Sequence, residues 1–241
     1  IFTNISSASA ATMRHVPNAA ARAIRSKHTR QIGLLLRNED GHRFHNLAAF
    51  VLLLGINARL ESEGYLLSVV RVGDVGGKRQ TRSRVFEERV LDGLIAFSQF
   101  TDEIADWVSE QIPNCIWVDS NRFGPFNCLR RDEAHVGQLV AKHILNLGYR
   151  KVLWAGDTPT ALSHFSQIDR FEVIKQTVTQ QGVDFHSLNS WPKPEQKRWI
   201  YTQLPQLLKP DTVVTAYNVH AANAVMVAAA SMGLMIGRDY G

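Results

Sequence analysis

Short apolar runs alternate with longer segments of helical periodicity from Gln31 onward, and this alternation constrains the fold more than any other feature of the chain. The apolar runs predict strands at 31–37, 66–72, 92–97, 114–119, 151–155, 184–189 and 211–216. Residues 133–147 place apolar side chains three and four positions apart, and Gly148 follows as a signal for the end of a helix. Strands and helices in this order predict an α/β fold whose parallel sheets are covered by helices on both faces.

A long polar link at 120–132, SNRFGPFNCLRRD, interrupts the alternation and predicts a boundary between two lobes, 31–130 and 131–241. With 241 residues and 45% apolar composition, the chain has enough apolar side chains for a substantial core. In parallel sheets, ligands bind beyond the carboxyl ends of the strands. We therefore expect functional residues directly after each predicted strand.

The N-terminal segment, residues 1–30, differs in composition from the rest of the chain. The first 37 residues contain no acidic side chain and six basic ones, at Arg14, Arg22, Arg25, Lys27, Arg30 and Arg37. Because the whole chain has a net charge of +5, the cationic excess is concentrated in this segment. This placement is typical of an arm that binds a polyanion, although a solvated linker has the same composition. Residues 18–25, after Pro17, favour a helix that is too short to be stable without a partner.

Several classes of protein are not indicated. No apolar run approaches the ~20 residues needed to cross a bilayer and no signal peptide is recognisable, so we expect a cytoplasmic protein with no membrane contact. Cys115 and Cys128 lack metal-site spacing and are expected to be free, buried thiols. His42 and His45 have no carboxylate or cysteine at metal spacing, and no serine-nucleophile signature is present. We therefore predict no metal, no cofactor and no catalytic residue.

Several blocks of the sequence follow one another in a characteristic order. They are 16–25 (VPNAAARAIR), 27–35 (KHTRQIGLL), 91–95 (LDGLI), 112–119, 143–152, 215–218 (TAYN) and 232–234. In this order and spacing they resemble the hinge and core of the LacI/GalR (lactose-repressor/galactose-repressor) family of transcription regulators. The resemblance implies a helix-turn-helix headpiece, a hinge helix and a two-lobed core similar to periplasmic binding proteins of type I. We expect this sequence to hold the arm and hinge at 1–30 and incomplete versions of both lobes, with the headpiece outside it.

The resemblance assigns DNA contacts to the hinge. The matching positions are Asn18, Ala19, Arg22, Ile24 and Arg25. In the family, the hinge helices of a dimer enter the minor groove together, and an apolar side chain from each one unstacks a base step. Ile24 occupies that position. The implied partners are therefore operator DNA and further copies of the chain, as a homodimer or a tetramer.

The resemblance also implies a small-molecule effector, a sugar or another metabolite, held between the lobes. The matching positions are Arg37, Arg43, Phe44, Phe97, Ser98, Asp119, Gln167, Trp191 and Asn218. Phe44 and Trp191 have rings that can stack on a ligand or pack in the core. Asp119 and Asn218 have oxygens that can accept from ligand hydroxyls, and Asp119 can equally cap the turn after its strand. Effector binding would shift the population of lobe arrangements and so change the affinity for DNA.

Some of these positions depart from the family pattern. The family's Asn-Pro-Phe-Phe after the first strand is replaced by residues 41–44 (GHRF), its arginine in the second lobe by Gln167, and the acid that usually follows Asn218 by Val219. Loss of an arginine and a carboxylate removes the strongest charge-assisted contacts to a sugar. The departures indicate an atypical effector, an anion in view of Arg37 and Arg43, or no effector.

Taken from the sequence, these features favour a DNA-binding transcription regulator, expected to be a repressor, whose core senses a small molecule. The alternative is a solute-binding protein of the same fold that serves sugar transport, but such a protein has no use for a basic hinge. An α/β enzyme is a third hypothesis, and the lack of an acid and base pair at the strand ends counts against it.

Overall fold

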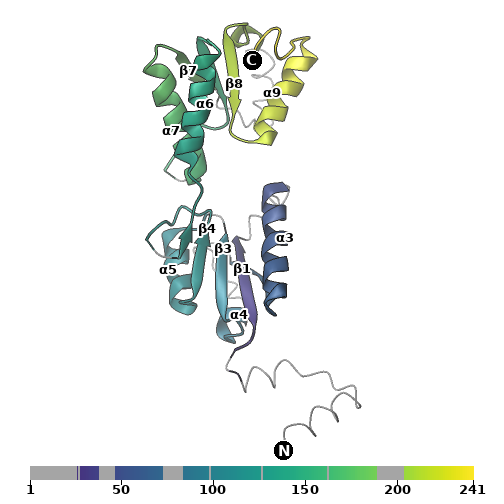
Figure 1. The fold of residues 1–241 in the computed structure, drawn as a ribbon, viewed down its shortest axis with the longest axis vertical. Helices are drawn as coiled ribbons and strands as arrows, with labels where there is room; N and C mark the ends of the chain where they lie inside the picture. Colours follow the sequence, from purple (N-terminus) through teal and green to yellow (C-terminus); the bar gives the residue numbers. More distant parts are fainter. Residues whose placement is uncertain are drawn as a thin grey trace, which may run out of the picture. The chain divides into compact units, whose positions relative to one another are not determined.

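The computed structural model describes residues 26, 28–37, 47–72, 84–97, 99–125, 127–161, 163–188 and 204–241. The chain divides into two compact units, Ile1–Arg130 and Arg131–Gly241, and each is described by itself (Figure 1). The expected hinge helix at 18–25 lies outside the described residues.

The first unit is built on a parallel sheet with the strand order β2-β1-β3-β4-β5. The strands are β1 (Gln31–Arg37), β2 (Leu66–Val72), β3 (Gly93–Phe97), β4 (Cys115–Val118) and β5 (Cys128–Leu129). Ala96 on the central strand β3 and Leu35 on the neighbouring strand β1 are completely buried. The core of this unit therefore lies under the middle of the sheet.

The helices of the first unit differ in how they meet the core. They are α3 (Leu47–Ser62), α4 (Arg84–Glu87) and α5 (Asp102–Gln111). Helix α5 begins where the Thr101 hydroxyl accepts from the N–H of Ile104 at 3.5 Å, and it buries Ile104 and Val108 against the sheet. Helix α3 is apolar over residues 47–56 and polar in its last turns, and several of its large apolar side chains stay exposed in this unit.

The second unit is a sheet of order β7-β6-β8 with helices on both faces (Figure 1). Its strands are β6 (Lys151–Ala155), β7 (Asp184–Ser187) and β8 (Thr212–Ala216), and its helices are α6 (Glu133–Asn146), α7 (Phe165–Thr179) and α9 (Val219–Ser231). Successive side chains of a strand point to opposite faces. Val152 and Trp154 accordingly pack in the cluster that contains residues of α6 and α7, while Leu153 and Ala155 pack in the cluster that contains α9.

The structure confirms the parallel α/β architecture and each predicted strand, with ends that differ by at most two residues. The predicted helix at 133–147 is α6, and Gly148 follows it with φ +76°, a left-handed conformation that glycine adopts without strain. Strand β5 was not predicted, because a pair of residues is too short to show periodicity. It forms because the Trp117 N–H donates to the Asn127 carbonyl at 2.7 Å.

The cysteines match the expectation in part. Both thiols are free, and Cys115 is buried. Cys128 is only half-buried, which corrects the expected burial, since it lies on β5 at the edge of the sheet. None of the helices in the described parts of the chain combines the length and apolar character needed to cross a bilayer.

Candidate functional site

Polar side chains gather at the carboxyl ends of the strands in the second unit. Tyr217 directly follows β8, and its hydroxyl lies 2.9 Å from Oγ of Ser166 in the first turn of α7. His164, which caps α7, places Nδ1 2.8 Å from the same Oγ. Ser166 is 1% exposed, so its hydroxyl has its hydrogen bonds supplied inside the protein.

A buried ion-pair network adjoins this cluster. The carboxylate of Glu133, in the first turn of α6, is 1% exposed and pairs with Nη1 of Arg131 at 2.6 Å and with Nε of Arg170 on α7. Nη1 of Arg170 also donates to the Tyr217 carbonyl at 3.1 Å, and its guanidinium lies 5.5 Å from the centroid of the Tyr217 ring. A buried carboxylate is tolerated when it is paired in this way. The network ties the start of α6, the middle of α7 and the end of β8 together.

The end of β6 contributes a third group of contacts. The indole N–H of Trp154 and the side-chain amide of Gln167 both donate to the Asp157 carbonyl, at 3.3 Å and 2.7 Å. Gly156 lies between Trp154 and Asp157 in the chain. A Cβ at this position would be 3.0 Å from Nε1 of Trp154 and 3.2 Å from Cβ of Tyr217. Glycine at this position therefore allows the Trp154 and Tyr217 rings to approach to 6.3 Å.

Asn218 has a structural role. Its Oδ1 accepts from the N–H of Ala221 at 2.9 Å, and it is the N-cap of α9. One lone pair of this oxygen is therefore used by the helix, and the predicted contact between Asn218 and a ligand hydroxyl stays a prediction. Gln167 likewise has its amide nitrogen engaged by Asp157.

The predicted residues of the first unit lie at the ends of neighbouring strands. Arg37 ends β1, Phe97 ends β3 and Asp119 directly follows β4, and all three strands are parallel. The structure therefore brings these positions to the same edge of the sheet. Asp119 has φ +52°, which is uncommon for a residue with a side chain, and its N–H donates to the Leu129 carbonyl at 2.8 Å. This hydrogen bond extends the pairing of β4 with β5.

The remaining predicted site residues are outside the described residues. They are Arg43, Phe44, Ser98, Trp191 and the side chain of Arg37 among the effector positions, and Asn18, Ala19, Arg22, Ile24 and Arg25 among the DNA-binding positions.

Sequence reasoning missed Glu133, Arg170 and Tyr217. The residue after each predicted strand was treated as a candidate, and Tyr217 follows the strand predicted at 211–216, so the same rule would have selected it. Glu133 and Arg170 had no such signal, because their pairing depends on how α6 and α7 pack against each other.

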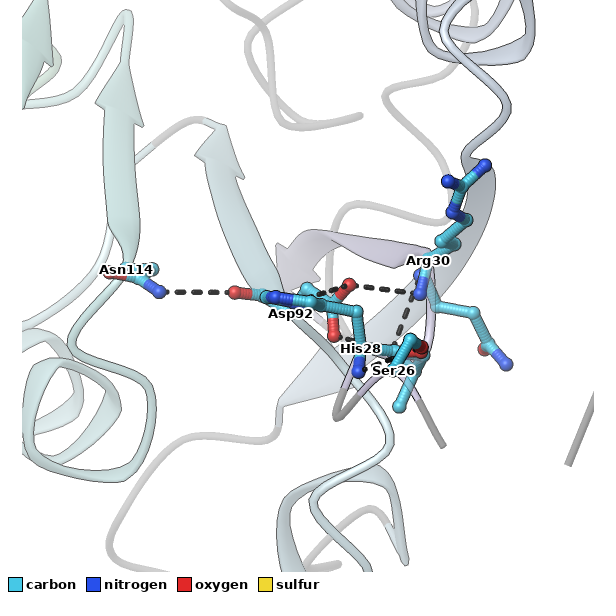
Figure 2. Close-up of polar contacts among 7 residues, drawn as sticks. Ser26, His28, Arg30, Asp92 and Asn114 are labelled. Atoms are coloured by element: carbon cyan, nitrogen blue, oxygen red, sulfur yellow. Dashed lines mark hydrogen bonds and ion pairs between the residues drawn. The ribbon is translucent and has the colours of Figure 1, made fainter. Parts of the chain in front are cut away.

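A different polar cluster lies at the opposite, amino-terminal end of the strands in the first unit (Figure 2). The Asp92 side chain, 15% exposed, accepts at Oδ1 from the N–H and the hydroxyl of Thr29, at 2.8 and 2.9 Å. Its Oδ2 accepts from the N–H of Arg30 at 2.9 Å and lies 3.7 Å from Nδ1 of His28. The cluster holds the residues directly before β1 against the residue directly before β3.

The surroundings of Asp92 favour its charged form. Burial alone would raise the pKa of the Asp92 carboxyl. The backbone N–H groups of Thr29 and Arg30, the Thr29 hydroxyl and the nearby His28 outweigh this effect and lower the pKa below its ordinary value. Asp92 is therefore an ionised acceptor at neutral pH. In the part of the chain that the structure describes, no group of His, Cys, Asp and Glu side chains is arranged to hold a metal ion.

Comparison with known proteins adds to this picture. No protein-family model matches the chain. The maltose regulon regulatory protein MalI of Escherichia coli K12 is 22% identical over 175 residues, which are 71% of this chain and 49% of MalI. The transcriptional regulator DegA of Bacillus subtilis is 24% identical over 178 residues, which are 71% of this chain and 50% of DegA. The chain thus spans about half the length of the curated relatives it matches.

Solved structures share the fold. A probable maltose operon repressor, MalR, from Staphylococcus aureus has a TM-score of 0.70 at 15% identity, over 88% of this chain and 77% of that one. The lac repressor dimer bound to operator and the anti-inducer ONPF also has a TM-score of 0.70, at 20% identity, over 93% and 77% of the two chains.

Two units of parallel sheet, each with polar residues at its strand ends, define a two-lobed core of the periplasmic-binding-protein type. The curated relatives are transcriptional regulators, so in sequence and in fold the chain is similar to regulators of the LacI family.

Proposed function

We propose that this chain is the hinge and sensing core of a cytoplasmic transcriptional repressor that binds operator DNA as a dimer. The observation that carries the proposal is sequence similarity to curated transcriptional regulators over 71% of the chain. The fold alone would not support it, because the same core also serves solute transport.

The DNA-binding part of the proposal concerns residues 1–30. Asn18, Ala19, Arg22 and Arg25 would contact phosphates and base edges, and Ile24 would separate a central base step. The basic side chains of this arm would add a salt-dependent attraction to the DNA backbone.

The test is fluorescence anisotropy of the full-length protein on DNA from its own upstream region, with random competitor at two salt concentrations. Tight binding that survives the competitor supports a specific regulator. The variant Ile24→Ala should then lose specific affinity and keep nonspecific affinity. Binding that disappears equally on all sequences as salt rises would instead favour the solute-binding alternative.

We also propose that the strand ends of the second unit form part of an effector site. Tyr217 offers a ring and a hydroxyl, and Arg170 offers a guanidinium that is partly exposed beside it. A ring next to a fixed cation suits a flat or hydroxylated ligand with an acceptor group. We also propose Arg37, Phe97 and Asp119, at the strand ends of the first unit, as effector-binding residues. The same proposal includes the matching positions Arg43, Phe44, Ser98, Gln167, Trp191 and Asn218.

The effector proposal is tested by thermal shift of the full-length protein with a panel of sugars, purine bases and phosphorylated metabolites. A ligand that binds the folded protein raises its melting temperature. Tyr217→Phe removes the hydroxyl and keeps the ring, so affinity for that ligand should fall by about fivefold. The control is Tyr65→Phe, directly before β2, which should leave affinity unchanged. If Tyr217→Phe binds as tightly as the wild type, Tyr217 is not in the effector site.

The dimer part of the proposal is supported by an exposed apolar surface on the first unit. Helix α3 exposes Phe50, Val51 and Leu54 by 47%, 59% and 53%, and the edge strand β2 exposes Leu66 and Val69 by 65% and 57%. A contiguous exposed apolar surface of this kind is typical of an interface that a partner covers. A second copy of the chain is such a partner, because the hinge of a symmetric operator-binding protein acts in pairs.

A further inference from the structure

The polar cluster around Asp92 lies where the N-terminal arm meets the core, far along the first unit from the strand ends considered for the effector. We propose that Asp92 is a positioning residue for DNA binding: its carboxylate fixes residues 28–30 to the start of β3 and so sets where the arm leaves the core. This inference rests on the proposed function, since the arm is assigned to DNA there.

Both oxygens of Asp92 are engaged by the arm. Oδ1 accepts from the N–H and hydroxyl of Thr29, and Oδ2 accepts from the N–H of Arg30 and faces the ring of His28. These partners are consecutive in the chain, and all lie more than 60 positions before Asp92 in the sequence. Figure 2 shows His28 and Arg30 beside the Asp92 carboxylate. Hydrogen bonds to an ionised acceptor are stronger than those between neutral groups.

The backbone of Arg30 explains why a side chain is needed for this task. Arg30 has φ +55°, a left-handed conformation that residues with a Cβ rarely adopt. Its N–H is held by Asp92, and its carbonyl accepts from the N–H of Leu66 at 2.9 Å. The chain therefore turns at Arg30 before it enters β1, and Asp92 holds that turn from one side while β2 holds it from the other.

The main chain of Asp92 is fixed as well. Its N–H donates to the Gln31 carbonyl at 2.8 Å, and its carbonyl accepts from the side-chain amide of Asn114 at 3.2 Å. The anchor is thus built into the sheet at the starts of β1, β3 and β4. Strand β3 runs from this anchor to Phe97, at the edge of the proposed effector site. A shift of β3 would therefore be transmitted to the arm through a single short strand.

The charge of Asp92 allows an anchoring role to be distinguished from a purely electrostatic effect on DNA binding. Replacing Asp92 by Asn removes a negative charge next to a basic arm, and charge alone would then strengthen the attraction to DNA. Loss of the anchor predicts the opposite, because the arm would be correctly placed for only a fraction of the time. The direction of the change separates the two effects.

The experiment compares full-length wild type, Asp92→Asn and Glu110→Gln by anisotropy on operator and on random DNA. Glu110 is an exposed carboxylate on α5, so Glu110→Gln is matched in charge but leaves the anchor intact. Asp92→Asn should lower operator affinity by about tenfold or more and leave affinity for random DNA within about twofold. Glu110→Gln should change neither. Thr29→Val keeps the side-chain shape and removes the hydroxyl, which donates to Asp92 and accepts from the N–H of Gln31, and it should have a smaller effect in the same direction.

Amide hydrogen exchange on the same proteins is an independent measure of the anchor. The N–H groups of Thr29 and Arg30 should exchange faster in Asp92→Asn than in Glu110→Gln, at conditions where both remain folded. If the wild type does not prefer operator over random DNA, the proposed function fails. In that case amide hydrogen exchange alone tests whether Asp92 anchors residues 28–30. Asp92→Asn with unchanged or tighter operator binding, or with unchanged exchange at these amides, would overturn the inference. If Asp92→Asn does not fold, Thr29→Val decides by the same criteria.

Discussion

The backbone N–H of Arg30 donates to Oδ2 of Asp92 across 2.9 Å, although the two residues are 62 positions apart in the chain. This contact joins the residue before β1 to the residue before β3. It closes a long loop that includes α3, β2 and α4. The acceptor is charged and lies at the amino-terminal end of the strands.

The Asp92 contacts predict how stability changes with pH. Because the folded-state pKa of Asp92 is below its ordinary value of 3.8, the charged form stabilises the fold, and this contribution is fully present above pH 3.8. The contribution is lost as pH falls further, through the folded-state pKa. In urea unfolding, wild type should exceed Asp92→Asn by about 1–2 kcal/mol from pH 7 to pH 5, and the difference should shrink below about pH 4. A difference that grows on acidification would contradict this account.

The cap at Asn218 predicts a loss of stability that depends on the replacement. Asn218→Ala removes the hydrogen bond to the N–H of Ala221 and should lower the free energy of unfolding by about 1 kcal/mol. Asn218→Asp keeps an acceptor and adds a negative charge at the start of α9, so it should unfold within about 0.5 kcal/mol of wild type. Urea unfolding of the wild type and both variants measures these differences in the free energy of unfolding. An equal loss of unfolding free energy in both variants would show that the acceptor at residue 218 does not stabilise the helix.

The exposed side of α3 predicts an effect on oligomeric state. Leu54→Glu places a charge on the surface that we propose to be covered in the dimer, and it should shift sedimentation of the full-length protein toward monomer. Leu139→Glu is the control, because Leu139 on α6 is also 53% exposed but lies in the second unit. Leu139→Glu should leave the dimer intact. A dimer that survives Leu54→Glu, or that is lost equally in both variants, would argue against this surface.

The cysteines are predicted to differ in reactivity. Both line a hollow of about 470 Å³ beside β4 and β5, but burial raises the pKa of the Cys115 thiol to about 11. At pH 8 only about one Cys115 in a thousand would then be the reactive thiolate. A thiol reagent should therefore modify one cysteine quickly and the other slowly in the native protein. Cys128→Ser should abolish the fast phase. Loss of the fast phase in Cys115→Ser would reverse the assignment.

The sequence predicted most of the strands because each one carries an apolar run long enough to be seen. The buried strands β1 and β6 are continuous apolar segments, as expected for parallel strands that are covered on both faces. Strand β5 was not predicted, because its position is determined by pairing with β4 and no local sequence pattern indicates that pairing.

The candidate sites were predicted less completely. The family resemblance assigned Arg37, Phe97 and Asp119 to the effector site, and in the structure these positions share one edge of the first sheet, while their role stays a prediction. The rule that functional residues follow the strands gave no weight to the other end of the strands, where Asp92 lies. Residues such as Asp92 and Glu133 act through partners that are distant in the chain, so their roles depend on tertiary packing.

We propose that one small molecule and operator DNA are linked through this core, so that binding of one changes the affinity for the other. The most direct test is operator affinity of the full-length protein, by anisotropy with competitor DNA, with and without the ligand that raises the melting temperature most. The account predicts a change in operator affinity of about fivefold or more, and an equal change in ligand affinity when operator is present. Specific operator binding whose affinity is the same with and without a bound ligand would contradict it.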